Sequence, residues 1–402
     1  MWLRRSRCLV VLTLACVPGV VRGLGQARIS LEAIDLDATL SLDRLATQLA
    51  TKRVVFIGET HDRYDHHLTQ LEIIRRLHQT DPDLAIGVEY FQQPFQPQVD
   101  DYIARRTNEN EFLRSAEYFQ GWGYDYRMYA PIFRFAREQH IPVRALNVPT
   151  ALPSAIFKSG IAGLVTANRV DAKLSEQQRA YLPKEIVPAD EDYKSRLRTA
   201  FAAHGPAKPD AFDHFVEAQL VWDEGMAESA AAYLTANPGR RMVILAGSGH
   251  LAFGSGIPKR LERRTHATYA IVLNSGENVE PHMADYLVLG KKEELPPAGV
   301  LGVTLEEKCG FEEKNGSEQK NGCRIRSLSP GGAAEEAGLK KGEVLLEVDG
   351  QPIHGMADLR TALWEKRPGD RVQLSVRQKP RAGTTRSYAI ELTAPATPPG
   401  KS

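Results

Sequence analysis

Histidine and carboxylate side chains follow short apolar runs at three separate places in the chain. Glu59 and His61 follow one run, Glu89 follows the next, and His250 follows a later one. Imidazole and carboxylate groups are common ligands of zinc, manganese and iron, and they are also common general acids and bases. These four residues therefore predict a metal-binding or acid–base site, provided that the fold brings them together.

The apolar runs that precede these residues must supply the positioning. They are nearly continuous rather than alternating, which is typical of parallel strands covered on both faces. Helical spacing separates them, as in residues 65–77 and 130–139, so we expect an α/β fold, mainly a parallel sheet flanked by helices. The expected strands are residues 53–57, 84–88, 142–148, 241–246, 269–273 and 286–289. Ligands bind beyond the carboxyl ends of such strands, where the four polar residues stand.

Residues 149–237 form a predicted helical insertion, with helices over 191–203 and 210–235. Gln219 and Asp223 are four residues apart on the apolar stripe of the second helix. Buried polar groups need partners, so we expect both side chains to meet the polar strand ends. The alternative is that the buried part of the helix ends near them.

Each polar residue also has a simpler interpretation, because a single histidine or carboxylate at a strand end is often only hydrogen-bonded. His66 and His67 begin a predicted helix, where we expect them to face solvent. Ser248 lies in a segment similar to a nucleophile elbow, but the G-x-S-x-G pattern fails at both outer positions. A serine esterase is therefore not favoured.

The composition limits the class of protein. The chain has 402 residues, 42% hydrophobic and 25% charged, with a formal net charge of +1. Two domains with cores of their own fit this length, and the weak charge argues against a nucleic-acid partner. A change to short strands and glycine turns predicts a boundary near residue 295, which gives domains over 28–294 and 295–394 and a disordered tail over 395–402.

The N-terminus has the pattern of a secretory signal peptide over residues 1–27. Arg4, Arg5 and Arg7 precede an apolar run over 8–21 that Pro18 interrupts, which makes a membrane anchor the weaker alternative. We expect an exported protein, periplasmic or associated with the outer envelope, with a lipid anchor at Cys16 as an open alternative. In an exported domain, Cys309 and Cys323 are candidates for a disulfide, and two buried thiols are the alternative.

The first domain resembles the ChaN-like haem-binding proteins, which are related to the erythromycin esterases and the TraB/Tiki proteins. The resemblance runs from about residue 45 to 290, through residues 54–61 (VVFIGETH), 87–91 (GVEYF), 146–149 (LNVP), 219–227 (QLVWDEGMA) and 244–250 (ILAGSGH). It implies haem or iron handling at the envelope. In the esterase and Tiki relatives, the equivalent positions support hydrolysis, with a metal in some.

The resemblance also implies which residues form the site. His61, Glu89 and His250 are the expected metal ligands, and with Glu59 they are the expected catalytic residues. Zinc or manganese is the alternative to haem. The expected haem-binding residues are His61, His250, Tyr90, Gln219 and Asp223. The axial haem ligand stays open among Tyr64, Tyr90, Tyr124 and Tyr126.

Residues 298–393 resemble a PDZ domain of the kind found in bacterial proteases. Such a domain adds a peptide C-terminus to its sheet as an extra strand and holds the carboxylate with backbone amides. A helix is expected over 357–365. The expected peptide-binding residues are Val300, Leu301, Gly302, Val303, Leu359 and Leu363.

Three functions therefore remain. The protein binds haem or iron, or it is a metal-dependent hydrolase, or its PDZ domain makes it an adaptor whose α/β domain is inactive. The partners expected are haem or a small molecule and a protein C-terminus, and a homodimer is left open.

Overall fold

A computed structural model describes residues 39–166, 174–202, 210–276, 279–306, 309, 311–314, 317–320, 322–378 and 384–395. The predicted signal peptide, Cys16 and all but the first residue of the predicted tail lie outside these ranges. Within them, no helix combines the length and apolar character needed to cross a membrane.

The first domain is built on a six-stranded sheet in which every neighbouring pair of strands is parallel. The strand order is β3-β2-β4-β1-β5-β6. The strands are β1 (Val54–Glu59), β2 (Leu84–Gln92), β3 (Val143–Asn147), β4 (Arg241–Gly247), β5 (Tyr269–Asn274) and β6 (Tyr286–Val288). The predicted strands and the α/β class are confirmed.

Strand β1 is buried along its whole length because its side chains enter two separate cores. Val55 and Ile57 point to one face of the sheet, and Val54 and Phe56 point to the other. Successive strand residues face opposite sides, so a strand covered on both faces must be apolar at every position. This explains why the sequence shows runs rather than alternation.

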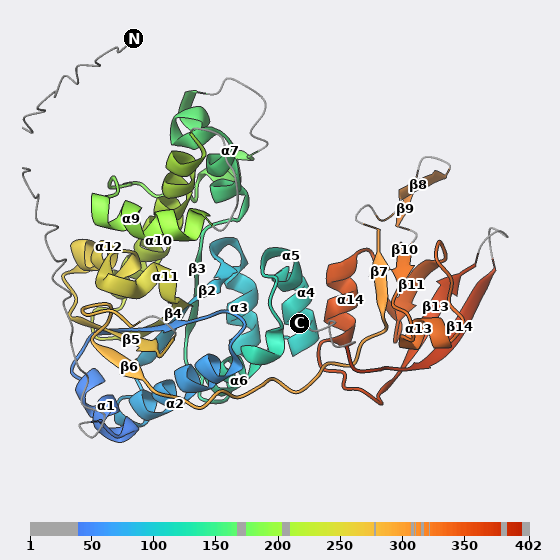
Figure 1. Cartoon of the computed structure of the whole chain (residues 1–402), viewed down its shortest axis with the longest axis horizontal. Helices are drawn as coiled ribbons and strands as arrows, with labels where there is room; N and C mark the ends of the chain where they lie inside the picture. Colours follow the sequence, from blue (N-terminus) through green and yellow to red (C-terminus); the bar gives the residue numbers. More distant parts are fainter. Residues whose placement is uncertain are drawn as a thin grey trace, which may run out of the picture. The chain divides into compact units, whose positions relative to one another are not determined.

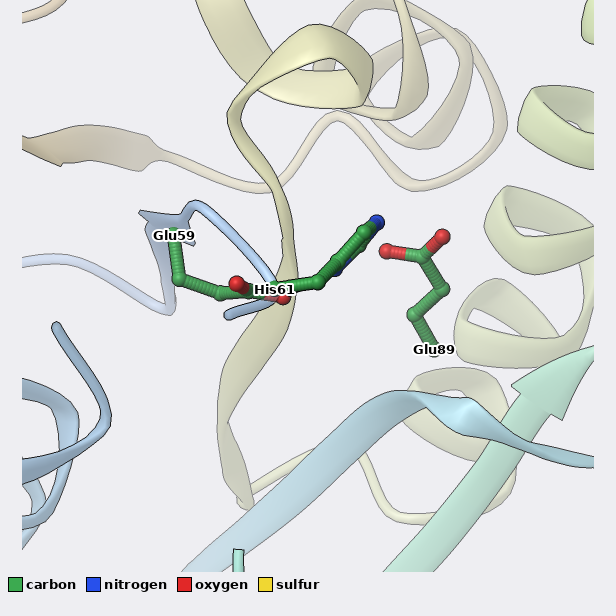
Figure 2. Close-up of side chains that lie close together, drawn as sticks. All are labelled: Glu59, His61 and Glu89. Carbon is green, nitrogen blue, oxygen red and sulfur yellow. Dashed lines mark hydrogen bonds and ion pairs between the residues drawn. The ribbon is translucent and has the colours of Figure 1, made fainter. Parts of the chain in front are cut away.

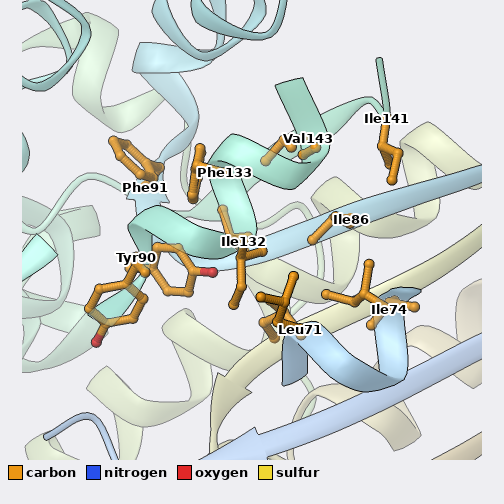
Figure 3. Packing of buried hydrophobic residues seen from close by; sticks show 14 of the residues in the cluster. Leu71, Ile74, Ile86, Tyr90, Phe91, Ile132, Phe133, Ile141 and Val143 are labelled. Atoms are coloured by element: carbon orange, nitrogen blue, oxygen red, sulfur yellow. The ribbon is translucent and has the colours of Figure 1, made fainter. Parts of the chain in front are cut away.

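Helices cover both faces of the sheet. The first core lies against α1, which precedes β1, and against the helices between β1 and β3. Figure 3 shows Leu71 and Ile74 from one of these helices and Ile132 and Phe133 from another over the strand residue Ile86. The helices on this side are α1 (Leu42–Leu49), α2 (Tyr64–Thr80), α3 (Gln96–Ile103), α4 (Glu109–Ser115), α5 (Tyr118–Gly121) and α6 (Ala130–Glu138), with short turns η2 (Gln93–Phe95) and η3 (Tyr126–Met128). The second core lies against α10 (Ala211–Ala236), α11 (Ser248–Leu251) and α12 (Ile257–Thr265), with η4 (Ala252–Gly254) between the last two.

The predicted helical insertion is present. It consists of α7 (Ala151–Thr166), α8 (Glu176–Arg179), α9 (Glu191–Ala202) and the first half of α10. Figure 1 shows α7, α9 and α10 grouped beyond one edge of the sheet. Leu152 and Ile156 of α7 share a small core with Val221 of α10, so the insertion has its own packing and forms a cap.

The second domain is an antiparallel sheet with two helices and its own core. Strands β7, β10, β11, β13 and β14 are hydrogen-bonded in the order β14-β13-β11-β10-β7, and β12 pairs with β11. The elements are β7 (Val303–Leu305), β10 (Cys323–Leu328), α13 (Ala333–Glu336), β11 (Val344–Val348), β12 (Gln351–Pro352), α14 (Met356–Leu363), β13 (Arg371–Arg377) and β14 (Thr385–Glu391), with a separate hairpin of β8 (Phe311–Lys314) and β9 (Ser317–Lys320). Cys309 and Cys323 are joined by a disulfide.

Candidate functional site

The carboxyl ends of three adjacent strands carry the predicted polar residues. Glu59 is the last residue of β1 and pairs in register with Gly247, the last residue of β4. Glu89 lies on β2, which is the other neighbour of β4. The one-turn helix α11 then brings His250 back over the same edge. The parallel sheet thus gathers side chains that are up to 191 positions apart in the sequence.

The first imidazole is held by a buried carboxylate. His61 Nδ1 lies 2.6 Å from Glu59 Oε1, and because a carboxylate only accepts, this nitrogen carries the proton. The other ring nitrogen is therefore the one available to a ligand. Burial lowers the pKa of His61, but the Glu59 hydrogen bond and the nearby Glu89 carboxylate outweigh burial and raise it.

The second imidazole has the same arrangement. His250 Nδ1 lies 2.6 Å from Oδ1 of Asp223, a residue of α10 with no solvent exposure. His250 Nε2 lies 3.4 Å from Glu89 Oε1. Burial lowers the pKa of His250, but the carboxylates of Glu89 and Asp223 outweigh burial and raise it to about 9. The imidazole is therefore protonated at neutral pH.

Glu89 lies between these two pairs. Its Oε2 accepts a 2.7 Å hydrogen bond from the Gly247 amide, and Figure 2 shows the His61 ring extended toward its carboxylate. Gly247 leaves room for the His61 ring, since a Cβ atom there would lie 2.8 Å from His61 Cε1 and the ring would have to move. A close approach of this kind is one reason for a glycine at a strand end.

His61, Glu89 and His250 line one cavity of about 530 Å³. This volume lies within the usual range for small-molecule sites. Its walls are mainly aromatic, and its described lining contains no lysine or arginine. The other lining residues are Tyr90, Phe91, Gln92, Ala116, Glu117, Tyr118, Gly121, Trp122, Tyr124, Asn147, Thr150 and Trp222.

Several buried polar atoms around this cavity lack a hydrogen-bond partner among the described residues. They are Glu59 Oε2, Tyr90 Oη and Asn147 Oδ1. Buried polar groups are rarely left unsatisfied, so these atoms offer hydrogen-bonding positions to a polar ligand or to water. An adjoining cavity of about 720 Å³ shares Gln92, Glu117, Gly121 and Thr150 with this one and extends the space available to a ligand.

Three residues around the cavity could hold a metal ion. One ligand atom from each of Glu59, His61 and Glu89 lies within 4.8 Å of the others. The predicted ligands His61 and Glu89 belong to this group, and His250 does not. Two carboxylates and one imidazole suit zinc, manganese or iron.

The fit to haem is partial. An imidazole whose Nδ1 proton is held by a carboxylate is the usual form of an axial histidine, and aromatic walls suit a flat macrocycle. The lining described above offers the two haem propionates no cationic partner. The cavity therefore suits the iron and the macrocycle of haem, but it offers less to the edge of haem that carries the propionates.

The remaining predicted residues fall into two groups. Asp223 and Tyr90 are at the site, and so is Tyr124, whose ring centroid lies 5.0 Å from that of His61. Gln219, in contrast, does not line the cavity. Among the other axial candidates, Tyr64 does not line it, and Tyr126 is buried elsewhere with its hydroxyl directed at Glu109.

The expectation for His66 and His67 is wrong. They are 5% and 1% exposed, respectively. His66 Nδ1 accepts from the Thr60 amide, and His67 Nε2 lies 3.3 Å from the His61 carbonyl oxygen. The first turn of α2 packs beneath the loop that follows β1, so both rings support that loop.

Three residues at the site were missed by the sequence interpretation. Trp122 and Trp222 line the cavity. Tyr193 of α9 donates a 2.7 Å hydrogen bond from its hydroxyl to Asp223 Oδ2. The sequence holds no local signal for Tyr193, because the contact depends on how the cap folds back over α10.

The second domain has a groove between the start of β7 and α14. The six predicted peptide-binding residues all line it, and Met356 and Arg360 extend the α14 side. Gly302 has φ of +72°, and a Cβ atom there would lie 3.2 Å from Gly332 Cα, so the loop before β7 needs a glycine.

Comparisons with known proteins support both domains. The family model described as "Haem-binding uptake, Tiki superfamily, ChaN" matches residues 45–261, and the PDZ domain model matches residues 301–377. No curated protein matches the chain.

Solved structures are similar to parts of the chain. ChaN of Campylobacter jejuni with cofacial haem is 16% identical, with 62% of this chain and 91% of that chain covered and a TM-score of 0.49. A mutant of the erythromycin esterase EreC is 16% identical, with 57% and 72% covered and a TM-score of 0.36. The HtrA3 PDZ domain bound to a phage-derived ligand is 17% identical, with 23% and 84% covered and a TM-score of 0.19.

Proposed function

The chain belongs to the haem-binding uptake family ChaN of the Tiki superfamily and carries a PDZ domain, and from this premise we propose that it is an exported envelope protein that binds haem in the His61 cavity and a protein C-terminus in the PDZ groove. Haem is the cofactor of the family to which the α/β domain belongs. Iron delivery or uptake at the envelope follows from that family and from the signal-like N-terminus.

One observation carries the haem proposal. His61 faces an aromatic cavity with its Nδ1 proton held by Glu59, which leaves Nε2 for a ligand. Bound haem would supply an iron centre. His61 would hold the iron, and the rings of Trp122 and Tyr124, whose centroids lie 4.9 Å and 5.0 Å from that of His61, would provide apolar contacts.

The test is a haem titration of protein that lacks residues 1–27. We expect a Soret band that saturates at one haem per cavity and is lost in His61→Ala. His354→Ala is the matched control, because this histidine is exposed and belongs to the second domain. Tyr124→Phe decides between the two nearest axial candidates. If Tyr124→Phe changes the spectrum and His61→Ala does not, the assignment to His61 is wrong.

A second function is favoured by a specific observation, the placement of Glu89 between two imidazoles that each have a carboxylate of their own. In such an arrangement, the carboxylate can accept a proton and an imidazolium can donate one. His250, protonated at neutral pH, would act as the general acid, and Glu89 or a metal held by Glu59, His61 and Glu89 would activate water. The proposed reaction class is hydrolysis of an ester or amide.

Elemental analysis and turnover of chromogenic esters test this second function. We expect zinc or manganese in the purified protein, loss of turnover on chelation, and loss in Glu89→Gln. Turnover that survives His61→Ala would exclude it. The two functions are separable, because hydrolysis needs no Soret band and haem binding needs no turnover.

The groove function is capture of a protein C-terminus. Apolar walls from Leu301, Val303, Leu359 and Leu363 suit an apolar last residue. Peptides with a free carboxylate should bind, and the same peptides with an amidated end should not, because backbone amides recognise the carboxylate. Equal affinity for both forms would contradict this mode of binding.

Determining the N-terminal residue of the protein purified from cells tests the proposed export. Cleavage near residue 27 is the expected result, and a lipid on Cys16 is the alternative outcome. A mature protein that begins at Met1 and remains in the cytoplasm would remove the envelope location.

A further inference from the structure

The cap helix α9 reaches the candidate site through one side chain. The structure describes the whole of α9, and Tyr193 is its one buried residue, with 5% exposure. Every other residue of this helix is partly or fully exposed. The contact made by Tyr193 is therefore the direct route by which α9 can influence the cavity.

Tyr193 begins a chain of short contacts that ends in the cavity. Its hydroxyl donates to Asp223 Oδ2 at 2.7 Å, and Asp223 Oδ1 accepts from His250 Nδ1 at 2.6 Å. His250 Nε2 then faces Glu89 Oε1 at 3.4 Å. Burial and the Asp223 carboxylate raise the pKa of the Tyr193 hydroxyl, which therefore remains a donor.

The equivalent carboxylate on the other side of the cavity lacks such a partner. Glu59 Oε2 has no hydrogen bond among the described residues, and His67 Nε2 approaches it only to 3.8 Å. Asp223 without the Tyr193 hydroxyl would be in the same condition, since Arg260 approaches Oδ2 only to 3.9 Å. Hydrogen bonds to both oxygens hold a carboxylate group in one orientation, whereas a hydrogen bond to one oxygen leaves the group free to rotate.

The start of α9 is itself held in place. The Asp190 carboxylate accepts from the Tyr193 amide at 2.8 Å and from Lys259 Nζ of α12 at 3.1 Å. The Arg260 guanidinium lies 5.1 Å from the Tyr193 ring centroid. Contacts with α12 therefore fix the position from which the hydroxyl reaches Asp223.

We propose that Tyr193 is a positioning residue through which the cap helix α9 fixes the orientation of the His250 ring in the cavity. The proposal rests on the proposed function only in treating this cavity as the ligand site. It predicts that the phenol hydroxyl, rather than the packing of the ring, controls His250. The orientation of the His250 ring is then fixed, whereas the orientation of the His61 ring can change.

The test uses proton and nitrogen NMR of the full mature protein without any ligand, so it does not depend on haem binding or turnover. A proton in a short bond between an imidazole and a carboxylate resonates at very low field. His250→Gln identifies the resonance of His250 Nδ1–H. Tyr193→Phe keeps the ring and its contact with Arg260 but removes the hydroxyl, and we expect it to shift or broaden that resonance and to alter the nitrogen shifts of the His250 ring.

Two further variants separate the hydroxyl from packing. Tyr286→Phe removes a hydroxyl from β6 and should leave the His250 resonance unchanged. Tyr193→Leu also removes the ring and should reproduce the spectral change with an added loss of thermal stability. A Tyr193→Phe protein whose His250 proton and nitrogen resonances match the wild type would overturn the proposal, even if haem binds as expected. Failure of haem binding with a shifted resonance would instead count only against the proposed function.

Discussion

The two domains recognise their ligands by opposite means. In the α/β domain, charged side chains from three strand ends and a distant helix meet in a buried cavity. In the PDZ domain, a short loop and one helix form an apolar groove, and the backbone is expected to make the polar contacts. The site in the α/β domain therefore depends on the long-range fold and on the protonation states of its histidines and carboxylates. The groove of the PDZ domain depends mainly on local sequence.

The largest effect should come from removing the carboxylate that lies between the two imidazoles. Glu89→Ala removes the negative charge that raises the pKa of both His61 and His250 in the cavity. We expect the free energy of unfolding to fall by about 3–5 kcal/mol, as for other broken buried ion pairs. Chemical denaturation measures this. Glu335→Ala on the exposed side of α13 is the control, and a loss below about 1 kcal/mol in Glu89→Ala would mean that the charges are solvated.

Gly247→Ala should cause the second-largest loss of stability. The added Cβ would lie 2.8 Å from His61 Cε1, so the ring must move, at a cost of about 1–3 kcal/mol. Gly249→Ala is a matched control two residues away, because no atom lies within 4 Å of its Cβ position. We expect haem binding to weaken in the first variant only. Equal behaviour of the two variants would show that the close approach has no role.

Stability should depend on pH through His250. Its pKa is about 9 in the folded protein and about 6.5 when unfolded. The stabilising contribution is complete below about pH 6.5 and is lost as the pH rises through 9, by on the order of 3 kcal/mol. Thermal unfolding from pH 6 to 10 measures it, and His250→Gln should flatten the curve. Peptide affinity of the PDZ groove should stay constant over pH 6.5–9, which would sharpen the contrast between the domains.

The smallest effect is expected in the groove. Leu363→Glu places a charge on its partly exposed apolar wall, and we expect about a tenfold loss of peptide affinity, which is about 1.4 kcal/mol. Fluorescence anisotropy with a labelled peptide measures it. The haem spectrum of the same variant should be unchanged. A change in both would mean that the two sites are not independent.

The sequence was sufficient to predict the six parallel strands and the gathering of His61, Glu89 and His250. Both follow from one rule, since doubly covered strands are continuous apolar runs and their carboxyl ends share an edge. The site also contains Asp223, which was predicted from the polar positions on the apolar stripe of α10. The same reasoning also predicted Gln219, which does not line the cavity, whereas Trp222 of the same helix does.

Other features depend on packing that no local pattern encodes. Tyr193 looks like an ordinary aromatic residue of an amphipathic helix until α9 folds over α10. His66 and His67 were expected to face solvent, as polar residues at a helix start commonly do. They are buried because the first turn of α2 lies beneath the loop that carries His61.

The division of β1 between two cores makes the first domain intolerant of a change in chain length at that point. Deleting one residue within β1 would shift the strand residues on one side of the gap by one position and send their side chains to the opposite layer. If the residues after the gap shift, Glu59 also moves one position away from its pairing with Gly247. A single codon lost there would therefore disturb both layers of the domain and the ligand cavity together, whereas the same loss in the loop before α9 would leave the sheet intact.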